Sequence, residues 1–198
     1  DADASAWLRR ALADDDRAWA SEFGVAHDET GLASEANIFR YRPAAVAVRV
    51  TADSSPVRVA RLLAAAHRSG SRALVVPEPG ISAALATVLD AARRLNVDIG
   101  APADDAALVT RLSTRDIARV RMASAAGDGL RDLLAHRPEI ALLDDSVTAS
   151  GRVELRYWLL EQAVSMTLHR FGNPDRAFGE FVADLMQPEH ATPRPPQA

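Results

Sequence analysis

Three polar side chains alternate with apolar ones in the segment 162–171, QAVSMTLHRF. Ser165, Thr167 and His169 occupy every second position, so an extended chain places them on one face. A serine near a histidine suggests hydrolysis, in which the imidazole takes the hydroxyl proton. A nucleophilic serine, however, usually lies on a sharp turn, and its base comes from another element. The pattern therefore favours a strand whose polar face packs against a neighbouring protein surface, with catalysis by Ser165 and His169 as the alternative.

Two arginines flank a tyrosine at Arg40, Tyr41 and Arg42. Guanidinium groups bind carboxylates and phosphates through paired N–H donors, so this triplet could hold an anion. The simpler interpretation is a packed Tyr41 between two exposed arginines. If the arginines do bind an anion, we expect it to belong to another protein segment.

Two loops stand where an α/β protein could hold a cofactor or acid–base pair. The loop VVPEPGIS (75–82) keeps only Gly80 of a glycine-rich turn, and the Glu78 carboxylate would repel a phosphate. Asp144 and Asp145 end a predicted strand, but adjacent strand residues point to opposite faces. We therefore expect neither a catalytic nor a cofactor-binding residue in this chain.

Two absent residue types exclude further chemistry. The chain has no cysteine and no lysine, which removes thiolate nucleophiles, disulfides, P-loop lysines and Schiff bases. The histidines lack metal-motif spacing, so we expect no metal site: His27, His67, His136, His169 and His190. A net charge of −4 gives no footprint for nucleic acid, and no window is apolar enough for a membrane span. We expect a cytoplasmic protein.

Strands alternate with helices over residues 44–145, which predicts a Rossmann-like α/β domain with a parallel sheet. The predicted strands are 45–50, 72–77, 97–100, 118–123 and 140–145. Residues 1–43 precede this domain. There we predict two short helices, Ala4–Leu12 and Asp14–Phe23, with the acidic run 14–16 capping the second, followed by an extended arm. The first residues read as the interior of a longer chain.

The alternating pattern ends after residue 145. Gly151 predicts a hairpin-like turn, and we expect a helix from Val153 to Glu161 and a strand from Gln162 to Arg170. Residues 146–174 therefore form a third region. A fourth region, 175–198, combines a short amphipathic helix with a proline-rich tail that we expect to be disordered.

Three stretches carry a resemblance to a known family: ANIFRYRP (36–43), AVAVRVTAD (45–53) and GRVELRYWLLEQAVSMTLHRFGNP (151–174). They resemble the C-terminal region of long bacterial proline utilization A proteins, which join an FAD-dependent proline dehydrogenase to an NAD-dependent glutamate-semialdehyde dehydrogenase. The similarity runs from about Ala6 to Pro174. Its specific part is Glu161–Asn173, and the tail beyond matches nothing in the family.

The resemblance implies a domain like an aldehyde dehydrogenase cofactor domain, carrying a β-flap over residues 146–174 and no catalytic machinery. FAD and NAD would lie in other domains of the parent enzyme. The chain would act as a lid and assembly domain: it would pack against the aldehyde dehydrogenase domain of the same polypeptide, stabilise it, and seal the passage of pyrroline-5-carboxylate and glutamate semialdehyde.

The flap strand would add to another sheet edge, and the isolated chain could self-associate through it. The interface residues that we expect are Arg40, Tyr41, Arg42, Tyr157, Glu161, Gln162, Ser165, Thr167, His169, Arg170 and Asn173. The alternative is a stand-alone α/β domain that binds a small molecule or nucleotide at the carboxyl edge of its sheet.

Overall fold

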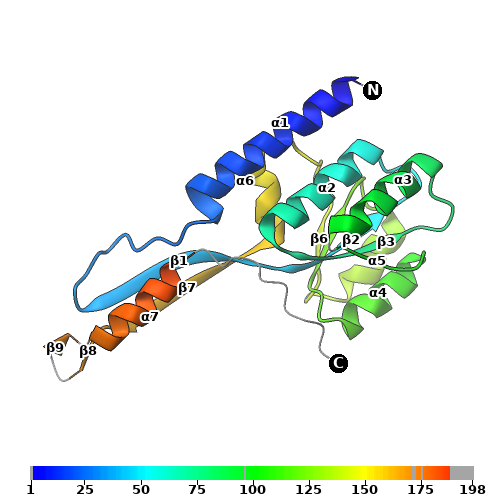
Figure 1. Cartoon of the computed structure of the whole chain (residues 1–198). Helices are drawn as coiled ribbons and strands as arrows, with labels where there is room; N and C mark the ends of the chain where they lie inside the picture. Colours follow the sequence, from blue (N-terminus) through cyan, green and yellow to red (C-terminus); the bar gives the residue numbers. More distant parts are fainter. Residues whose placement is uncertain (1, 96, 171–172, 175, 188–198) are drawn as a thin grey trace.

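The computed structural model describes residues 2–95, 97–170, 173–174 and 176–187. Its body is a parallel sheet of five strands in the order β4-β3-β2-β5-β6, which confirms the predicted Rossmann-like α/β fold (Figure 1). The strands are β2 (Ala45–Val50), β3 (Arg72–Pro77), β4 (Asp98–Ile99), β5 (Arg119–Met122) and β6 (Ala141–Leu143). The crossover helices are α2 (Pro56–Ser69), α3 (Ala83–Ala92), α4 (Asp105–Thr114) and α5 (Asp128–Ala135).

The central strand β2 has apolar side chains on both faces because helices cover both sides of the sheet. Val46, Val48 and Val50 belong to the core beneath α2 and α3, whereas Ala47 belongs to the core beneath α4 and α5. Helix α2 ends at Gly70, whose φ of 68° is the left-handed conformation that glycine adopts without steric cost. None of the described helices is long and apolar enough to cross a membrane.

The N-terminal segment is one helix, so the prediction of two short helices is wrong. Helix α1 (Ala2–Ala18) runs without a break into a π-helical turn, η1 (Trp19–Phe23). The acidic run does not cap a second helix, because tertiary partners hold its side chains. Asp15 is buried and accepts two hydrogen bonds from Arg61 in α2, at 2.8 and 2.7 Å. These contacts fasten α1 to the body.

A long ribbon extends from the body (Figure 1). It consists of β1 (Glu35–Pro43) and β7 (Leu159–Thr167), which pair antiparallel along their whole length. Helix α7 (Arg176–Met186) lies against the ribbon, where apolar side chains of α7 and β7 pack around the buried Ala36 and Ile38. A small hairpin of β8 (His169–Arg170) and β9 (Asn173–Pro174) follows β7.

The segment between the body and the ribbon differs from the prediction. Gly151 begins a helix, α6 (Gly151–Glu154), instead of a hairpin turn. A 3-10 turn, η3 (Leu155–Trp158), follows, and β7 begins at Leu159, so the predicted helix to Glu161 is wrong. The reason is tertiary: Trp158 is fully buried in the body, and its carbonyl accepts a hydrogen bond from Ala44 at 2.8 Å. The predicted tail, residues 188–198, lies outside the described residues.

Candidate functional site

The carboxyl edge of the parallel sheet is where a Rossmann domain holds its dinucleotide. In this chain the Thr51 hydroxyl after β2 and the Ser124 hydroxyl after β5 lie 2.7 Å apart and hydrogen bond across the point where the strand order reverses. The Glu78 carboxylate accepts a hydrogen bond from the Ala52 N–H at 2.9 Å. The hydroxyl and N–H donors that a pyrophosphate would need are therefore already hydrogen bonded to other groups of the protein.

Arg49, which is only 1% exposed, completes this arrangement. Its guanidinium donates to the Asp105 carboxylate and to the Ala103 carbonyl, both at 2.7 Å, and contacts Glu78 at 3.4 Å. The carboxylates of Glu78 and Asp105 would repel a phosphate at this edge. The guanidinium of Arg49, which could attract a phosphate, is already paired with these carboxylates. The residues present therefore do not fit a dinucleotide. Within the described ranges, no three acidic or histidine side chains gather as a metal-binding group.

The ribbon leaves one strand edge open. β7 pairs only with β1 among the described strands. At the two ends of the ladder, the Leu168 N–H donates to the Ser34 carbonyl and the Ala44 N–H donates to the Trp158 carbonyl, both at 2.8 Å. Antiparallel bonding alternates with a period of two, so the even-numbered residues of β7 bond to β1. The odd-numbered residues direct their N–H and C=O groups outward.

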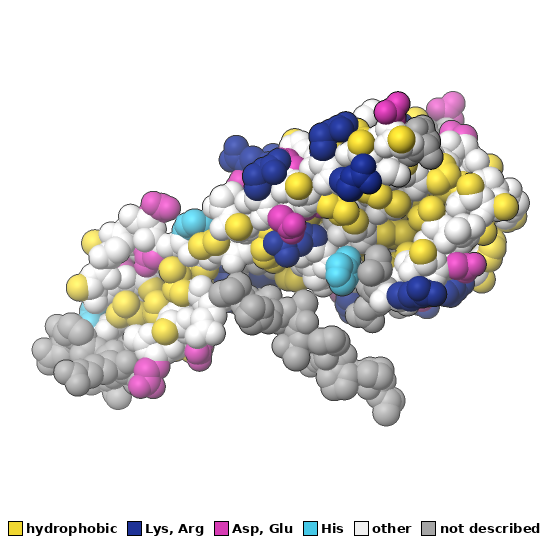
Figure 2. Space-filling model, turned by 45° about the horizontal axis from the view of Figure 1, so that its top comes forward, with side chains coloured by type: hydrophobic (Ala, Val, Ile, Leu, Met, Phe, Trp, Pro, Cys, Tyr) yellow, Lys and Arg dark blue, Asp and Glu magenta, His cyan; other side chains and the backbone are white. Residues whose placement is uncertain are grey.

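The same odd-numbered residues expose their side chains. Glu161, Ala163, Ser165 and Thr167 are exposed on one face of the ribbon, and the even-numbered positions between them are half-buried towards α7. Phe39 stands opposite Ala163 in the register and is also exposed. In Figure 2 the ribbon end, at the left, shows hydrophobic side chains with several acidic ones around them. This face and the open edge form one continuous surface.

A cavity of about 460 Å³ lies where the ribbon joins the body. Its polar lining consists of Tyr41, Arg119, Arg156, Tyr157 and Glu161, and its apolar lining of Ala141, Leu143, Val153 and Leu159. The cavity runs beside β6, one of the two edge strands of the parallel sheet. Residues from the ribbon, the sheet and η3 therefore meet at one site.

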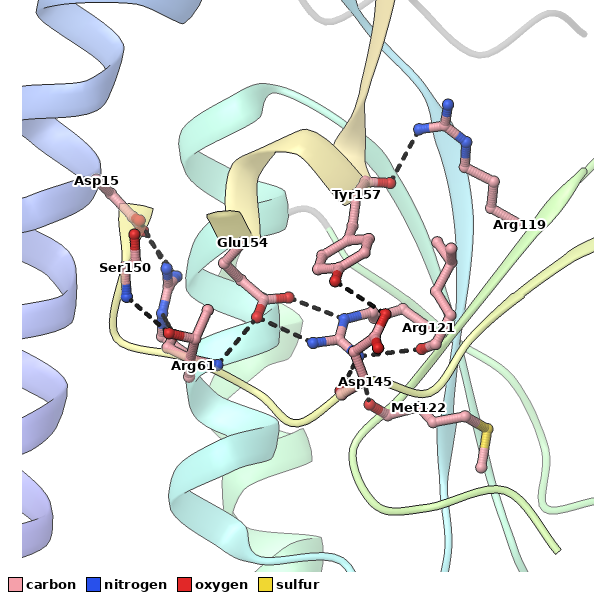
Figure 3. A network of polar contacts seen from close by, with 11 residues as sticks. Asp15, Arg61, Arg119, Arg121, Met122, Asp145, Ser150, Glu154 and Tyr157 are labelled. Carbon is pink, nitrogen blue, oxygen red and sulfur yellow. Dashed lines mark hydrogen bonds and ion pairs between the residues drawn. The ribbon is translucent and has the colours of Figure 1, made fainter. Parts of the chain in front are cut away.

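The two tyrosine side chains of this cavity are held by contacts with other residues. The ring of Tyr41 packs edge-on against Phe23 and Phe39, with ring centroids 4.9 and 5.2 Å apart. The Tyr157 hydroxyl donates to the Asp145 carboxylate at 3.0 Å, and its ring covers the guanidinium of Arg121 at 4.5 Å (Figure 3). Residues that do not line the cavity thus hold both tyrosine side chains in place, through contacts with Phe23, Phe39, Asp145 and Arg121.

Burial shifts the pKa of three groups here. It raises the pKa of Tyr41, which the neighbouring carboxylates of Glu22 and Glu161 raise further. Burial also raises the pKa of Tyr157, together with its hydrogen bond to Asp145. For Arg119, removal from water lowers the pKa of the guanidinium. Partial removal from water strengthens the electrostatic interactions that these groups can make.

Comparison with known proteins identifies the fold. No family model and no curated relative matches the chain. Among solved structures, proline utilization A from Corynebacterium freiburgense matches 84% of this chain with 32% identity and a TM-score of 0.57, over 14% of its own length. NADP-dependent glyceraldehyde-3-phosphate dehydrogenase from Bacillus halodurans C-125, complexed with NADP, matches 71% with 10% identity and a TM-score of 0.54, over 31% of its own. Succinate-semialdehyde dehydrogenase from Burkholderia pseudomallei matches 71% with 14% identity and a TM-score of 0.50, over 30% of its own.

The chain has an aldehyde-dehydrogenase-type Rossmann-like fold. It is similar to a domain of proline utilization A, and it spans only 14% of the length of that protein. The two dehydrogenases support the fold alone.

The structure places the predicted interface residues in two groups. Tyr41, Tyr157 and Glu161 line the cavity. The others follow the ribbon and its hairpin: Arg40, Arg42, Gln162, Ser165, Thr167, His169, Arg170 and Asn173. Arg40 donates to the Gln162 side chain at 2.7 Å and to the Leu185 carbonyl of α7 at 3.2 Å, so it ties the two strands to α7. Arg42 stands opposite Leu160 and Arg170 opposite Asn173 in the register.

Ser165 and His169 are not brought together as a catalytic pair. They are four residues apart along an extended chain, a separation of ~13 Å. Ser165 stands opposite Asn37 in the ribbon, whereas His169 stands opposite Pro174 in the small hairpin. No hydrogen bond joins them in the described part of the chain. The arrangement gives the serine no base.

The sequence-based reasoning missed Arg119 and Arg156. Arg119 begins β5, where it reads as the polar end of an apolar strand, and Arg156 lies in η3. Neither position follows a motif. The sequence carried no signal for either residue, because the contact between the Arg119 side chain and the start of β7 is visible only in three dimensions.

The phenols give a pH prediction, because Tyr41 and Tyr157 are the only tyrosines of the chain. We expect the near-ultraviolet absorbance of phenolate in the native protein to appear above the usual pKa of about 10. Unfolding in urea should restore the usual value. Since the folded state keeps these protons longer, the free energy of unfolding should fall as the pH rises through 10. A native titration curve that matches the denatured one would contradict this prediction. The variant Tyr157→Phe leaves only Tyr41 to ionise and so shows which titration step belongs to which tyrosine.

Proposed function

We propose that this chain is a non-catalytic lid and assembly domain of a bifunctional, cytoplasmic, proline-catabolic enzyme. It packs against the aldehyde dehydrogenase domain of the same polypeptide, stabilises that domain, and covers the passage of the intermediate between proline oxidation and aldehyde oxidation. FAD and NAD bind in other domains of the enzyme. The likeness to part of proline utilization A supports this proposal.

The open edge of β7 is the observation that carries the proposal. The strand is nine residues long, which exceeds the usual length of about five to six. Edge strands of folded proteins are normally protected by prolines, inward-pointing charges or bulges. β7 contains no proline, and Glu161 is its only charged residue. An unprotected edge of this length is suited to pair with a strand of another domain.

The carboxyl edge of the sheet also supports a non-catalytic role. Arg49 is paired with Asp105 and Glu78, and the hydroxyls of Thr51 and Ser124 bond to each other. These contacts stabilise the domain at the place where a catalytic relative of this fold would hold its cofactor. The ribbon, and not the sheet edge, then carries the function.

Ser165→Pro tests the docking of the β7 edge. The Ser165 N–H points outward, so proline removes a donor that β1 does not use and leaves a carbonyl of the docked strand unpaired. The cost of an unsatisfied buried group is about 2 kcal/mol, or roughly 30-fold in affinity. We expect the parent enzyme to lose coupled NADH formation from proline, and its β7 edge amides to exchange hydrogen as fast as solvent-exposed amides.

Ser165→Ala is the matched control, because it removes the hydroxyl and keeps the backbone N–H. We expect this variant to behave like the wild type, whereas lost activity would revive catalysis by Ser165. The isolated chain should self-associate less after Ser165→Pro, measured by sedimentation. If NADH formation from proline and from supplied pyrroline-5-carboxylate both remain unchanged in Ser165→Pro, the lid function is wrong.

A further inference from the structure

Arg119 is held in a way that leaves half of its guanidinium unused. Its Nη1 atom donates to the carbonyl of Tyr157 at 3.0 Å (Figure 3). The same atom donates to the carbonyl of Leu159 at 2.8 Å, so the side chain is fixed at the start of β7. No described residue accepts a hydrogen bond from Nε or Nη2, and the side chain lines the cavity. A rigid, half-buried arginine therefore presents two parallel N–H donors.

The unused edge of Arg119 has the geometry of a carboxylate receptor. Nε and Nη2 of one guanidinium donate side by side, and a carboxylate accepts both bonds with its two oxygens. Arg156 adds a second positive charge to the same lining. Within the described ranges neither arginine has an acidic partner, whereas the buried Arg49, Arg61 and Arg121 all do. A carboxylate here would complete the pattern.

The rest of the lining determines the kind of carboxylate. Leu143 and Val153 contribute apolar surface, so an aliphatic or aromatic chain finds contacts beside Arg119. The volume of about 460 Å³ admits a molecule considerably larger than acetate. The Glu161 carboxylate also lines the cavity and would repel a second negative charge. These features favour a single carboxylate on an apolar body.

We propose that the cavity between the ribbon and the body is a binding site for an amphipathic monocarboxylate. Nε and Nη2 of Arg119 hold the carboxylate, and Leu143 and Val153 contact its apolar part. The site goes beyond the lid function and is independent of it, since all of its residues belong to this chain. The carboxylate can be that of a free small molecule or that of an acidic side chain from the docked domain.

Titration of the chain with hexanoate tests the site. The NMR signal of the Arg119 Nε–H, assigned by its loss in Arg119→Lys, is expected to shift saturably with added hexanoate. Hexanamide, which has the same shape without the charge, should bind at least tenfold more weakly. Succinate, with two negative charges, should also bind at least tenfold more weakly because of Glu161. Hexanamide binding as tightly as hexanoate would overturn the proposal.

Three variants separate binding from folding. Arg119→Lys keeps the charge and loses the paired donors, so its affinity for hexanoate, measured by isothermal titration calorimetry, should fall at least tenfold. Because Arg119 also supports β7, this variant can fail to fold. Val153→Trp fills the cavity from an exposed position and leaves Arg119 in place, and it should abolish binding in a folded protein. Arg10→Gln, at an exposed position of α1, should bind like the wild type.

The parent enzyme identifies the source of the carboxylate. If hexanoate shifts the Arg119 signal in the isolated chain and in the parent enzyme, the ligand is a free molecule. If it does so only in the isolated chain, an acidic side chain of the docked domain occupies the site. Absence of any saturable shift in both proteins would overturn the proposal, while leaving the docking of β7 to its own test.

Discussion

Replacing Glu154 by glutamine is expected to lower the free energy of unfolding by about 3–5 kcal/mol. Glu154 and Arg121 are both fully buried, and Arg121 donates to the two carboxylate oxygens at 2.9 and 3.0 Å (Figure 3). Glutamine places an NH2 group where one oxygen accepted from Arg121 and from the Thr148 N–H. The guanidinium then stays buried without a counter-charge. A loss of this size is a large part of the 5–15 kcal/mol that stabilises a typical domain.

Urea unfolding measures this effect as a lower midpoint with an unchanged slope. Asp90→Asn is the matched control, because it removes the same kind of charge from an exposed pair with Arg93, and its cost should stay within about 0.5 kcal/mol. The double variant Arg121→Met/Glu154→Leu should be more stable than Glu154→Gln, since it leaves no lone charge. If Glu154→Gln and Asp90→Asn lowered the free energy of unfolding by the same amount, the buried ion pair would contribute no more to stability than the exposed one.

The body of the fold was predictable because its strands are apolar runs bounded by clear helix signals. β2 and β3 match their predicted ranges to the residue. The charged residues inside those runs were not explained: Arg49 and Arg121 interrupt apolar strands, and their partners Asp105 and Glu154 lie 56 and 33 residues further on. A buried arginine predicts that a carboxylate must exist, but only the tertiary fold selects which one.

The ribbon was predictable only in part. Alternation in residues 162–168 correctly indicated a strand with one apolar face, because α7 packs on that face. Its pairing with β1 was missed, since the two strands are separated by the whole body and antiparallel register leaves no local trace in sequence. The start of β7 was misplaced for the same reason: Trp158 ends the turn by inserting into the body, which is a long-range contact.

The candidate site combines predicted and unpredicted residues. Tyr41, Tyr157 and Glu161 were chosen from the sequence as interface residues, and the structure gathers them around one cavity. Arg119, which we propose to bind the carboxylate, was not chosen. Its role depends on two carbonyls of the β7 region that fix its side chain, and the sequence does not show them. The residue type indicates which side chains can bind a ligand. The fold decides which of their hydrogen-bond donors remain without a partner in the protein.

Gly151→Ala is expected to cost at least ~3 kcal/mol, the upper end of the usual cost of overpacking. A methyl group at this position would lie 2.5 Å from the Asp14 carbonyl oxygen and 2.6 Å from the Asp15 nitrogen. Both are backbone atoms of α1, so no side-chain rotation relieves the overlap, and α1 must move away from α6. The movement also breaks the 2.6 Å hydrogen bond from the Gly151 N–H to the Asp14 carboxylate.

Gly129→Ala provides a control of opposite sign. Gly129 lies in α5, and a methyl group there meets no atom within 4 Å. Alanine in a helix is more stable than glycine by about 0.5–1 kcal/mol, so this variant should raise the urea midpoint. Loss of the α1 contact should also expose Trp7 and Trp19, which pack partly buried against the core, and change their fluorescence in Gly151→Ala alone. If Gly151→Ala were as stable as wild type, α1 would not pack on α6 at the distance described.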